Sequence, residues 1–171
     1  MAVGASCTFN VVFTPPTAAV FTRTLTVAYT GATVTGSPVT LSGTGVTPGT
    51  LSFTAATNGS LATVLGIRTL TFTIPTPRAP VTSVVTVTNS GAGSLQITAD
   101  ALAINLGGLY SVTGTTCSFT TPLATGGTCT ISIRYATPAT RPILPDIGAL
   151  AVSNNGSGTT AGVSTLALNA Q

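Results

Sequence analysis

The stretch CSFTTPLATGGTCTISIRY, residues 117–135, joins two cysteines, a turn and the clearest strand pattern in the chain. From Cys129 to Tyr135, apolar and polar residues alternate, which is the period of a β-strand with one buried face. A proline and a Gly-Gly pair between the cysteines supply the backbone conformations that a reversal needs. The stretch therefore predicts a strand over 129–135, with Cys117 facing Cys129 across a connection.

A similar pattern occurs at the start of the chain. Residues 7–13, CTFNVVF, alternate in the same way, and their surroundings match those of Cys129 at an offset of 122 residues. Two further pairs of predicted strands correspond at offsets of 125 and 127 residues: 24–27 with 149–152, and 39–42 with 166–169. The drifting offset indicates small loop insertions between two copies of one pattern.

The repeat predicts the domain organisation. We expect a tandem array of units of about 125 residues. Residues 1–46 are then the C-terminal part of a preceding Ig-like repeat, and residues 47–171 are a complete Ig-like β-sandwich repeat. The Gly- and Pro-rich segment 43–49 is the expected linker between them.

The remaining segments predict further strands. The patterns at 50–53, 69–74, 81–89 and 109–112 are typical of strands, and SGAG at 90–93 predicts a hairpin from 81–89 to 94–98. Only 99–106 could hold a helical turn. About seven to nine short strands at this spacing indicate an all-β chain, folded as an antiparallel sandwich.

Charge is scarce in this chain. Charged residues make up 4% of the 171 residues and hydrophobic residues 43%, with a net charge of +3. The five arginines are isolated from one another, whereas nucleic-acid binding needs clustered cations, so we expect no nucleic-acid partner. Polar residues interrupt every apolar run well before the roughly 18 residues of a membrane helix, so we expect no membrane span. No signal peptide is visible at Met1, and we favour the interpretation that the chain is an excerpt.

Several of these segments together carry a family resemblance. They are PGTLSF at 48–53, VTVTNSG at 85–91, Cys117, and LATGGTCTI at 123–131. The set resembles the Hydin-type (ASH) immunoglobulin-like domain of bacterial choice-of-anchor surface repeat proteins. The resemblance covers 47–171 and the second half of a preceding copy in 1–46. It implies a seven-stranded sandwich in long extracellular arrays and implies no catalytic residues. The stretch 61–80 is longer than the family's usual first connection, and we expect it to insert an extra strand.

Catalytic chemistry has few residues to draw on. The sequence has no histidine, lysine or glutamate, so the chain alone cannot form Ser-His-Asp or Cys-His sites. Hydrolysis by paired carboxylates would require Asp100 and Asp146 to converge from separate loops. Zinc and calcium ligand patterns are absent from the sequence. We therefore predict no catalytic, cofactor-binding or metal-binding residues, no cofactor, and a chain that is not an enzyme.

The three cysteines are the remaining chemistry. We predict a disulfide between Cys117 and Cys129, because secreted β domains use such cross-links; the alternative is two buried free thiols. Cys7 corresponds to Cys129, so the counterpart of Cys117 would lie before Met1. We expect Cys7 to be unpaired within the chain, or to pair with a cysteine in a part of the chain beyond this sequence or in a neighbouring molecule.

Two Asn-Gly-Ser sequences, at Asn58 and Asn155, match the N-glycosylation sequon. Asn-Gly is also a common turn dipeptide, and we favour that interpretation. The arginines are interpreted as solvent-facing side chains.

The incomplete first repeat suggests a function. Three strands cannot bury a core alone, so residues 1–46 must be covered by other strands, either from the parent array or by strand addition from a neighbour. We expect a structural subunit or stalk of an extracellular bacterial filament or surface fibre whose copies join head to tail. The alternative is a cell-surface adhesin that binds glycan or protein through loops at one end of the sandwich.

Overall fold

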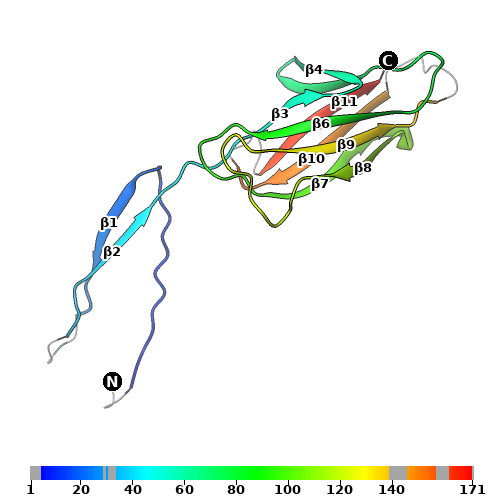
Figure 1. Cartoon of the computed structure of the whole chain (residues 1–171). Coiled ribbons are helices and arrows are strands. Elements are labelled where there is room, and N and C mark those ends of the chain that lie inside the picture. The colour runs from blue at the N-terminus through cyan, green and yellow to red at the C-terminus, as the bar shows by residue number, and fades with distance from the viewer. Residues whose placement is uncertain (1–4, 29, 31–33, 139–145, 157–161, 171) are drawn as a thin grey trace. The chain divides into compact units, whose positions relative to one another are not determined.

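The computed structural model describes residues 5–28, 30, 34–138, 146–156 and 162–170. The chain divides into two compact units, Met1–Thr47 and Pro48–Gln171, which we call the first and the second unit (Figure 1). The described residues form strands with a single short 3₁₀ turn and no α-helix. The predicted all-β class with antiparallel sheets is confirmed.

The first unit is built on one pair of strands. Strands β1 (Val20–Leu25) and β2 (Val39–Thr44) pair antiparallel, from Val20↔Thr44 to Leu25↔Val39. The ring of Phe13 lies edge-on to Phe21 at 6.1 Å between centroids. It also covers Gly43, where a Cβ would lie 2.8 Å from the ring. A glycine at that position lets the preceding segment lie close to the hairpin.

The predicted strand over 7–13 is wrong for this structure. These residues belong to no strand, and no other described residue forms a ladder with them. A strand needs a hydrogen-bonded neighbour, and β1 and β2 pair only with each other. The alternating pattern is therefore present in the sequence without the neighbours that would make it a strand.

The second unit consists of two sheets (Figure 1). One sheet has four strands in the order β3-β6-β9-β8, and the other has five strands in the order β4-β5-β11-β10-β7. All neighbours are antiparallel except β5 and β11, which are parallel. The strands are β3 (Leu51–Ala56), β4 (Gly59–Val64), β5 (Ile67–Phe72), β6 (Val81–Asn89), β7 (Ile97–Asn105), β8 (Tyr110–Thr115), β9 (Thr128–Tyr135), β10 (Asp146–Asn154) and β11 (Val163–Ala170).

One hydrophobic core lies between the two sheets. Strand β6 shows its origin most clearly, because buried residues alternate with half-buried ones along all nine positions. The fully buried side chains come from both sheets and include Val85, Val87, Ile131, Ile133, Leu70, Leu150, Val152, Leu166 and Leu168. Valine and isoleucine dominate the four-stranded side, as expected where β-branched residues pack on a pleated surface.

The predicted hairpin from 81–89 to 94–98 is wrong. Strand β6 belongs to the four-stranded sheet, whereas β7, which begins at Ile97, belongs to the five-stranded sheet. The buried side chain of Asn89 organises the crossing between them. Its Oδ1 accepts hydrogen bonds from the backbone of Thr50 and Gly91, and its Nδ2 donates to the carbonyls of Gly93 and Leu123.

The predicted helical turn over 99–106 is also wrong. Strand β7 continues to Asn105, and only Leu106–Gly108 forms a 3₁₀ turn, called η1. The run of alanine and leucine has good helix propensity, but pairing with β10 from Ile97 to Asn105 overrides it.

The stretch 61–80 does contain an added strand. Strands β4 and β5 form a regular hairpin, from Gly59↔Phe72 to Val64↔Ile67. Leu65 and Gly66 connect them, both with positive φ (50° and 82°), as in a type I′ turn. Of this hairpin, the sequence pattern predicted only the β5 strand.

Candidate functional site

Cys117 and Cys129 are joined by a disulfide. Cys129 is the second residue of β9, and Cys117 follows β8, its antiparallel neighbour. Both cysteines are only 6% exposed and belong to the core. The disulfide therefore closes the connection from β8 to β9 on its core side.

Cys7, in the first unit, carries a free and exposed thiol. It lies in the segment that forms no ladder with any described residue. Nothing among the described residues is bonded to its sulfur.

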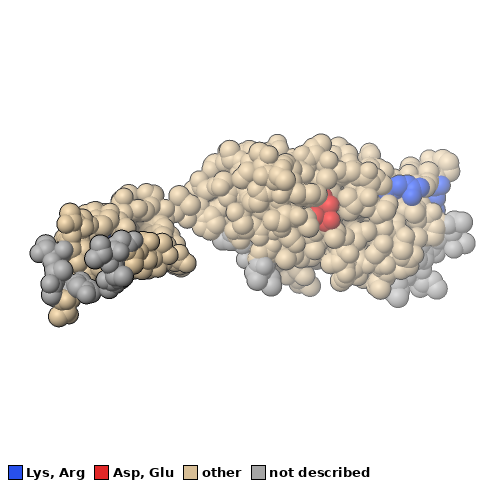
Figure 2. Space-filling model, turned by 90° about the horizontal axis from the view of Figure 1, so that it is seen from below, with Lys and Arg blue, Asp and Glu red and all other residues tan. Residues whose placement is uncertain are grey.

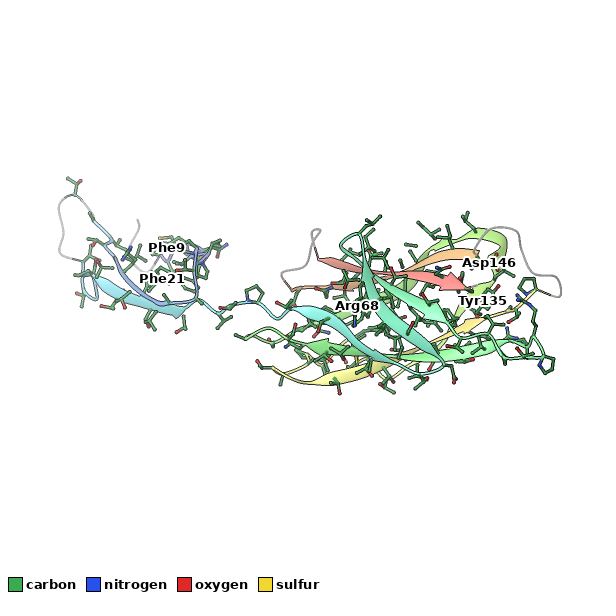
Figure 3. All side chains as sticks on the ribbon, turned by 90° about the horizontal axis from the view of Figure 1, so that it is seen from above. Phe9, Phe21, Arg68, Tyr135 and Asp146 are labelled. Carbon is green, nitrogen blue, oxygen red and sulfur yellow. A yellow bond between two sulfur atoms is a disulfide. The ribbon has the colours of Figure 1, made fainter. Side chains whose placement is uncertain are left out.

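A cluster of phenol rings and one carboxylate lies near the start of β10. The Tyr135 hydroxyl donates a hydrogen bond to Oδ2 of Asp146, and the Tyr110 hydroxyl donates to the Asp146 backbone carbonyl at 2.6 Å. The rings of Tyr110, Tyr135 and Phe72 pack together with centroids 5.2–5.9 Å apart. Figure 3 shows Tyr135 and Asp146 next to each other at one end of the unit.

Both tyrosines in this cluster are held in the neutral form. Burial, together with the Asp146 hydrogen bond and charge, raises the pKa of Tyr135 to about 12. Burial also raises the pKa of Tyr110 well above its usual range, and the charges of Tyr135 and Asp146 add to this. Both phenols therefore keep their protons and donate hydrogen bonds to Asp146, which links β8, β9 and β10 at this end of the core. Sequence reasoning missed it, although tyrosines at strand ends followed by an isolated aspartate were the available signal.

The two carboxylates do not converge. Asp100 on β7 is paired with Val152 of β10, whereas Asp146 is the first residue of β10. Asp146 and Val152 are six residues apart along this strand, which corresponds to roughly 20 Å. One carboxylate oxygen of Asp100 is buried and has no hydrogen-bond partner among the described residues.

A groove of about 790 Å³ lies where β5 separates from β11. The parallel ladder between these strands begins at Thr69↔Ala167, so the strands diverge on the other side of that pair. Arg68, labelled in Figure 3, provides the one charged side chain in the groove wall, and its Nε donates to the Phe53 carbonyl at 3.1 Å. The groove is lined by Thr50, Leu51, Ser52, Phe53, Thr63, Gly66, Ile67, Arg68, Ser164 and Thr165. The lining combines hydroxyls and one guanidinium with the apolar residues Leu51, Phe53 and Ile67, which suits a polar, uncharged or anionic ligand.

Asn58 and Asn155 both lie at bends of the chain, whereas Gly59 and Ser60 of the first Asn-Gly-Ser sequence already belong to β4. Asn58 has a positive φ of 49°, and its side-chain nitrogen donates to the Thr82 carbonyl at 2.8 Å. Asn155 exchanges two hydrogen bonds with Gln96. The third residue of the second sequon, Ser157, lies outside the described residues, as does Arg141.

The surface of the second unit is sparsely charged. On the face shown in Figure 2, charged atoms form small isolated patches on a surface that is otherwise neutral. Across the described ranges, no group of three or more His, Cys, Asp or Glu residues gathers as it would around a metal ion. No helix in those ranges is long and apolar enough to cross a membrane.

Comparisons with known proteins identify no family. No family model matches the chain, and no curated protein matches it. Among solved structures, it is similar to the secreted serine protease VesC from Vibrio cholerae, with 18% identity and a TM-score of 0.43. It is also similar to the VesB protease from Vibrio cholerae, with 22% identity and a TM-score of 0.44. Each similarity covers 66% of this chain, but only 23% of VesC and 32% of VesB.

These similarities correct one expectation from the sequence. The chain was predicted not to be an enzyme, and this is contradicted because both similar structures are proteases. We withdraw that prediction. The similarity itself, with both TM-scores below 0.5, places no catalytic residue in this chain.

Proposed function

We propose that this chain is a segment of an extracellular array of Ig-like β-sandwich repeats, and that the array forms a surface fibre or stalk. In this proposal the first unit is the C-terminal part of one repeat and the second unit is the next repeat. Neighbouring copies or repeats join head to tail by completing each other's sheets. The disulfide supports an oxidising, extracellular location, because such bonds persist mainly outside the cytosol.

The observation that carries the proposal is a shared strand register. At the sequence offsets of 125 and 127 residues, β1 corresponds to β10 and β2 corresponds to β11. The cross-strand residue pairs from Phe21↔Gly43 to Leu25↔Val39 then correspond to the cross-strand pairs from Asp146↔Ala170 to Leu150↔Leu166. A one-residue slip would turn every side chain to the opposite face, so an identical register in both places supports one ancestral hairpin.

A side-chain contact also corresponds between the two units. Phe13 corresponds in sequence to Tyr135 at the offset of 122 residues, and Phe21 corresponds to Asp146 at the offset of 125 residues. Phe13 packs against Phe21, whereas Tyr135 is hydrogen-bonded to Asp146. The same two positions therefore meet in both units, through two rings in one and a phenol and a carboxylate in the other.

The first unit has an apolar face that the other described residues cover only in part. Its residues 7–13 correspond to β9, which in the second unit lies between β6 and β8. Phe9, Val11 and Phe13 are 50–57% exposed, whereas their counterparts Ile131, Ile133 and Tyr135 are 0–1% exposed. Two flanking strands would complete this sheet, and their addition from a neighbour is the joint that we propose.

Electron microscopy of the purified chain, combined with mass measurement under nonreducing conditions, tests the proposal. Filaments with a regular axial repeat are expected, with Cys7 inaccessible to thiol reagents after assembly. Monodisperse monomers at all concentrations, with a Cys7 thiol that remains reactive, would contradict it.

A second candidate function is an adhesin module. The groove beside Arg68 favours it, because its hydroxyls and its guanidinium could bind a glycan or a carboxylate. Binding to a glycan array by monomers, lost in Arg68→Ala and retained in Arg134→Ala, is the result expected for this alternative. Filament formation without glycan binding would argue against it.

A further inference from the structure

Strand β4 is the one edge strand of the second unit with an unbroken ladder among the described residues. The edge strands β3, β7 and β8 all have register shifts against their neighbours, at Phe53/Ala55, Ala149/Leu150 with Ser153/Asn154, and Val112/Gly114. The β4–β5 ladder has none. Proteins usually block exposed edges with bulges, prolines or charges, and β4 (GSLATV) has none of these.

The hairpin geometry shows which backbone groups of β4 face outward. In a two-residue type I′ hairpin, the flanking pair Val64↔Ile67 is hydrogen-bonded, and hydrogen-bonded pairs then recur at every second residue. The hydrogen bond from Thr73 N to Asn58 O, at 2.9 Å, fits this alternation. Gly59, Leu61 and Thr63 therefore direct their N–H and C=O groups away from β5. No hydrogen bond from another described residue reaches this edge.

The side chains around this edge suit a second strand of the same sequence. Leu61 packs against the core but stays partly exposed, so part of its apolar side chain is left uncovered at the edge of the sheet. Ser60, Ala62 and Val64 are small or apolar and exposed on the other face. With no charge on β4, a second copy brings no like charges together.

We propose that β4 pairs antiparallel with β4 of a second copy of this chain, across a two-fold axis at Leu61. Leu61 then lies opposite Leu61 of the partner subunit, and Gly59 lies opposite Thr63 of the partner subunit. All three outward-facing residues form hydrogen-bonded pairs in this register. Three such pairs with two bonds each give about six backbone hydrogen bonds.

This interface is isologous, since the same strand serves both partners. It joins the two five-stranded sheets into one continuous sheet and places the two Leu61 side chains together. It differs from the head-to-tail joint of the first unit, so it neither requires filaments nor follows from them.

Sedimentation equilibrium of the whole chain, in a Cys7→Ser background, tests the interface. The parent chain is expected to dimerise. Thr63→Pro removes only an outward N–H and should abolish the dimer. Ala62→Lys places two ammonium groups near the axis and should weaken the dimer about tenfold at low salt, with recovery in high salt. Ala101→Lys, a matched change at an exposed position of β7, should leave the dimer unchanged.

Cysteine pairing tests the register. In the proposed register, Ser60 lies opposite Ala62 of the partner subunit in a non-hydrogen-bonded pair, with Cα atoms about 4.5 Å apart. A mixture of Ser60→Cys and Ala62→Cys chains should form the mixed disulfide dimer in preference to either homodimer. The proposal is overturned by a parent chain that remains a monomer, by a dimer that Thr63→Pro and Ala62→Lys leave intact, or by equal cross-linking in all combinations. The sedimentation runs are made below the concentration at which filaments appear, so a monomeric chain there overturns only the β4 interface. Electron microscopy at higher concentration tests the fibre proposal separately, because the head-to-tail joint does not use β4.

Discussion

The two hairpins β1–β2 and β10–β11 share one register but differ in their surroundings. Leu150 and Leu166 of the second unit are completely buried, whereas their counterparts Leu25 and Val39 are partly or largely exposed. The sequence pattern and the strand pairing are alike, so the hairpin itself does not determine burial. Burial comes from the sheet that faces the hairpin and from the strands beside it, which the described residues of the first unit lack.

Substitution of the two corresponding leucines should give the largest difference. Leu150→Ala creates a cavity in a closed core and should lower the free energy of unfolding of the second unit by about 2–5 kcal/mol. Leu25→Ala removes a side chain that already contacts water and should cost less than about 1 kcal/mol in the free chain. Chemical denaturation of both variants measures this contrast. Equal losses would show that the first unit already has a closed core.

The cysteines provide the next contrast. Cys117→Ser with Cys129→Ser removes a link over 12 residues and should destabilise the second unit by about 3 kcal/mol. Cys7→Ser, at the corresponding position of the first unit, should change the stability of the free chain by less than about 0.5 kcal/mol. Thermal melts with and without reductant distinguish the two. A comparable loss for Cys7→Ser would indicate that this thiol has a partner.

Alkaline pH should weaken the Tyr135–Asp146 contact of the second unit but not the corresponding contact of the first unit, which joins two phenylalanines. The folded pKa of Tyr135 is about 12 and lies above the unfolded value near 10, so the folded state holds its proton over that range. Stability is then complete below pH 10 and falls as pH rises toward 12. Tyr135→Phe should reduce this fall, at a cost of about 1 kcal/mol at neutral pH for the lost hydrogen bond. Thermal melts across this range, with tyrosinate absorbance, measure both effects. A flat profile in the parent chain would contradict the assignment.

The smallest expected effect concerns the β4–β5 hairpin, which has no counterpart in the described part of the first unit. Leu65 is 98% exposed and has a positive φ of 50°, whereas Asn58 has nearly the same φ and a residue type suited to it. Leu65→Asn should therefore raise stability by about 0.5–1 kcal/mol. Asn58→Leu is the matched control and should destabilise, because it also loses the hydrogen bond to Thr82. Denaturation midpoints give the sign, and a loss of stability in Leu65→Asn would mean that Leu65 has a packing role.

The strands that the sequence predicted well are those with neighbours on both sides. The segment 81–89 forms β6 with the predicted bounds, and 129–135 forms all but the first residue of β9. Each has alternating apolar residues that face a core, and each lies between two partners. Local pattern and tertiary environment agree in these strands, so pattern alone was sufficient.

The failures have a common cause. Residues 7–13 have the same pattern as β9 but lack strand partners, and the crossing after Asn89 depends on four backbone contacts spread over the sequence. The parallel pairing of β5 with β11 joins segments almost 100 residues apart, from Thr69↔Ala167 to Phe72↔Ala170. The Tyr110–Asp146 contact, which joins residues 36 apart, and the groove at Arg68 also depend on distant segments. Periodicity describes which face is apolar, and it does not specify which strand or loop will cover that face.

The central claim is that residues 7–13 form a strand only when a neighbour supplies its partners. Hydrogen exchange of this segment, compared between the dilute chain and assembled fibres, tests it most directly. In the dilute chain we predict fast exchange over 7–13 and strong protection over 128–135; in fibres, both segments should be protected to a similar degree. Fast exchange over 7–13 in assembled fibres, or full protection already in the dilute monomer, would contradict the account.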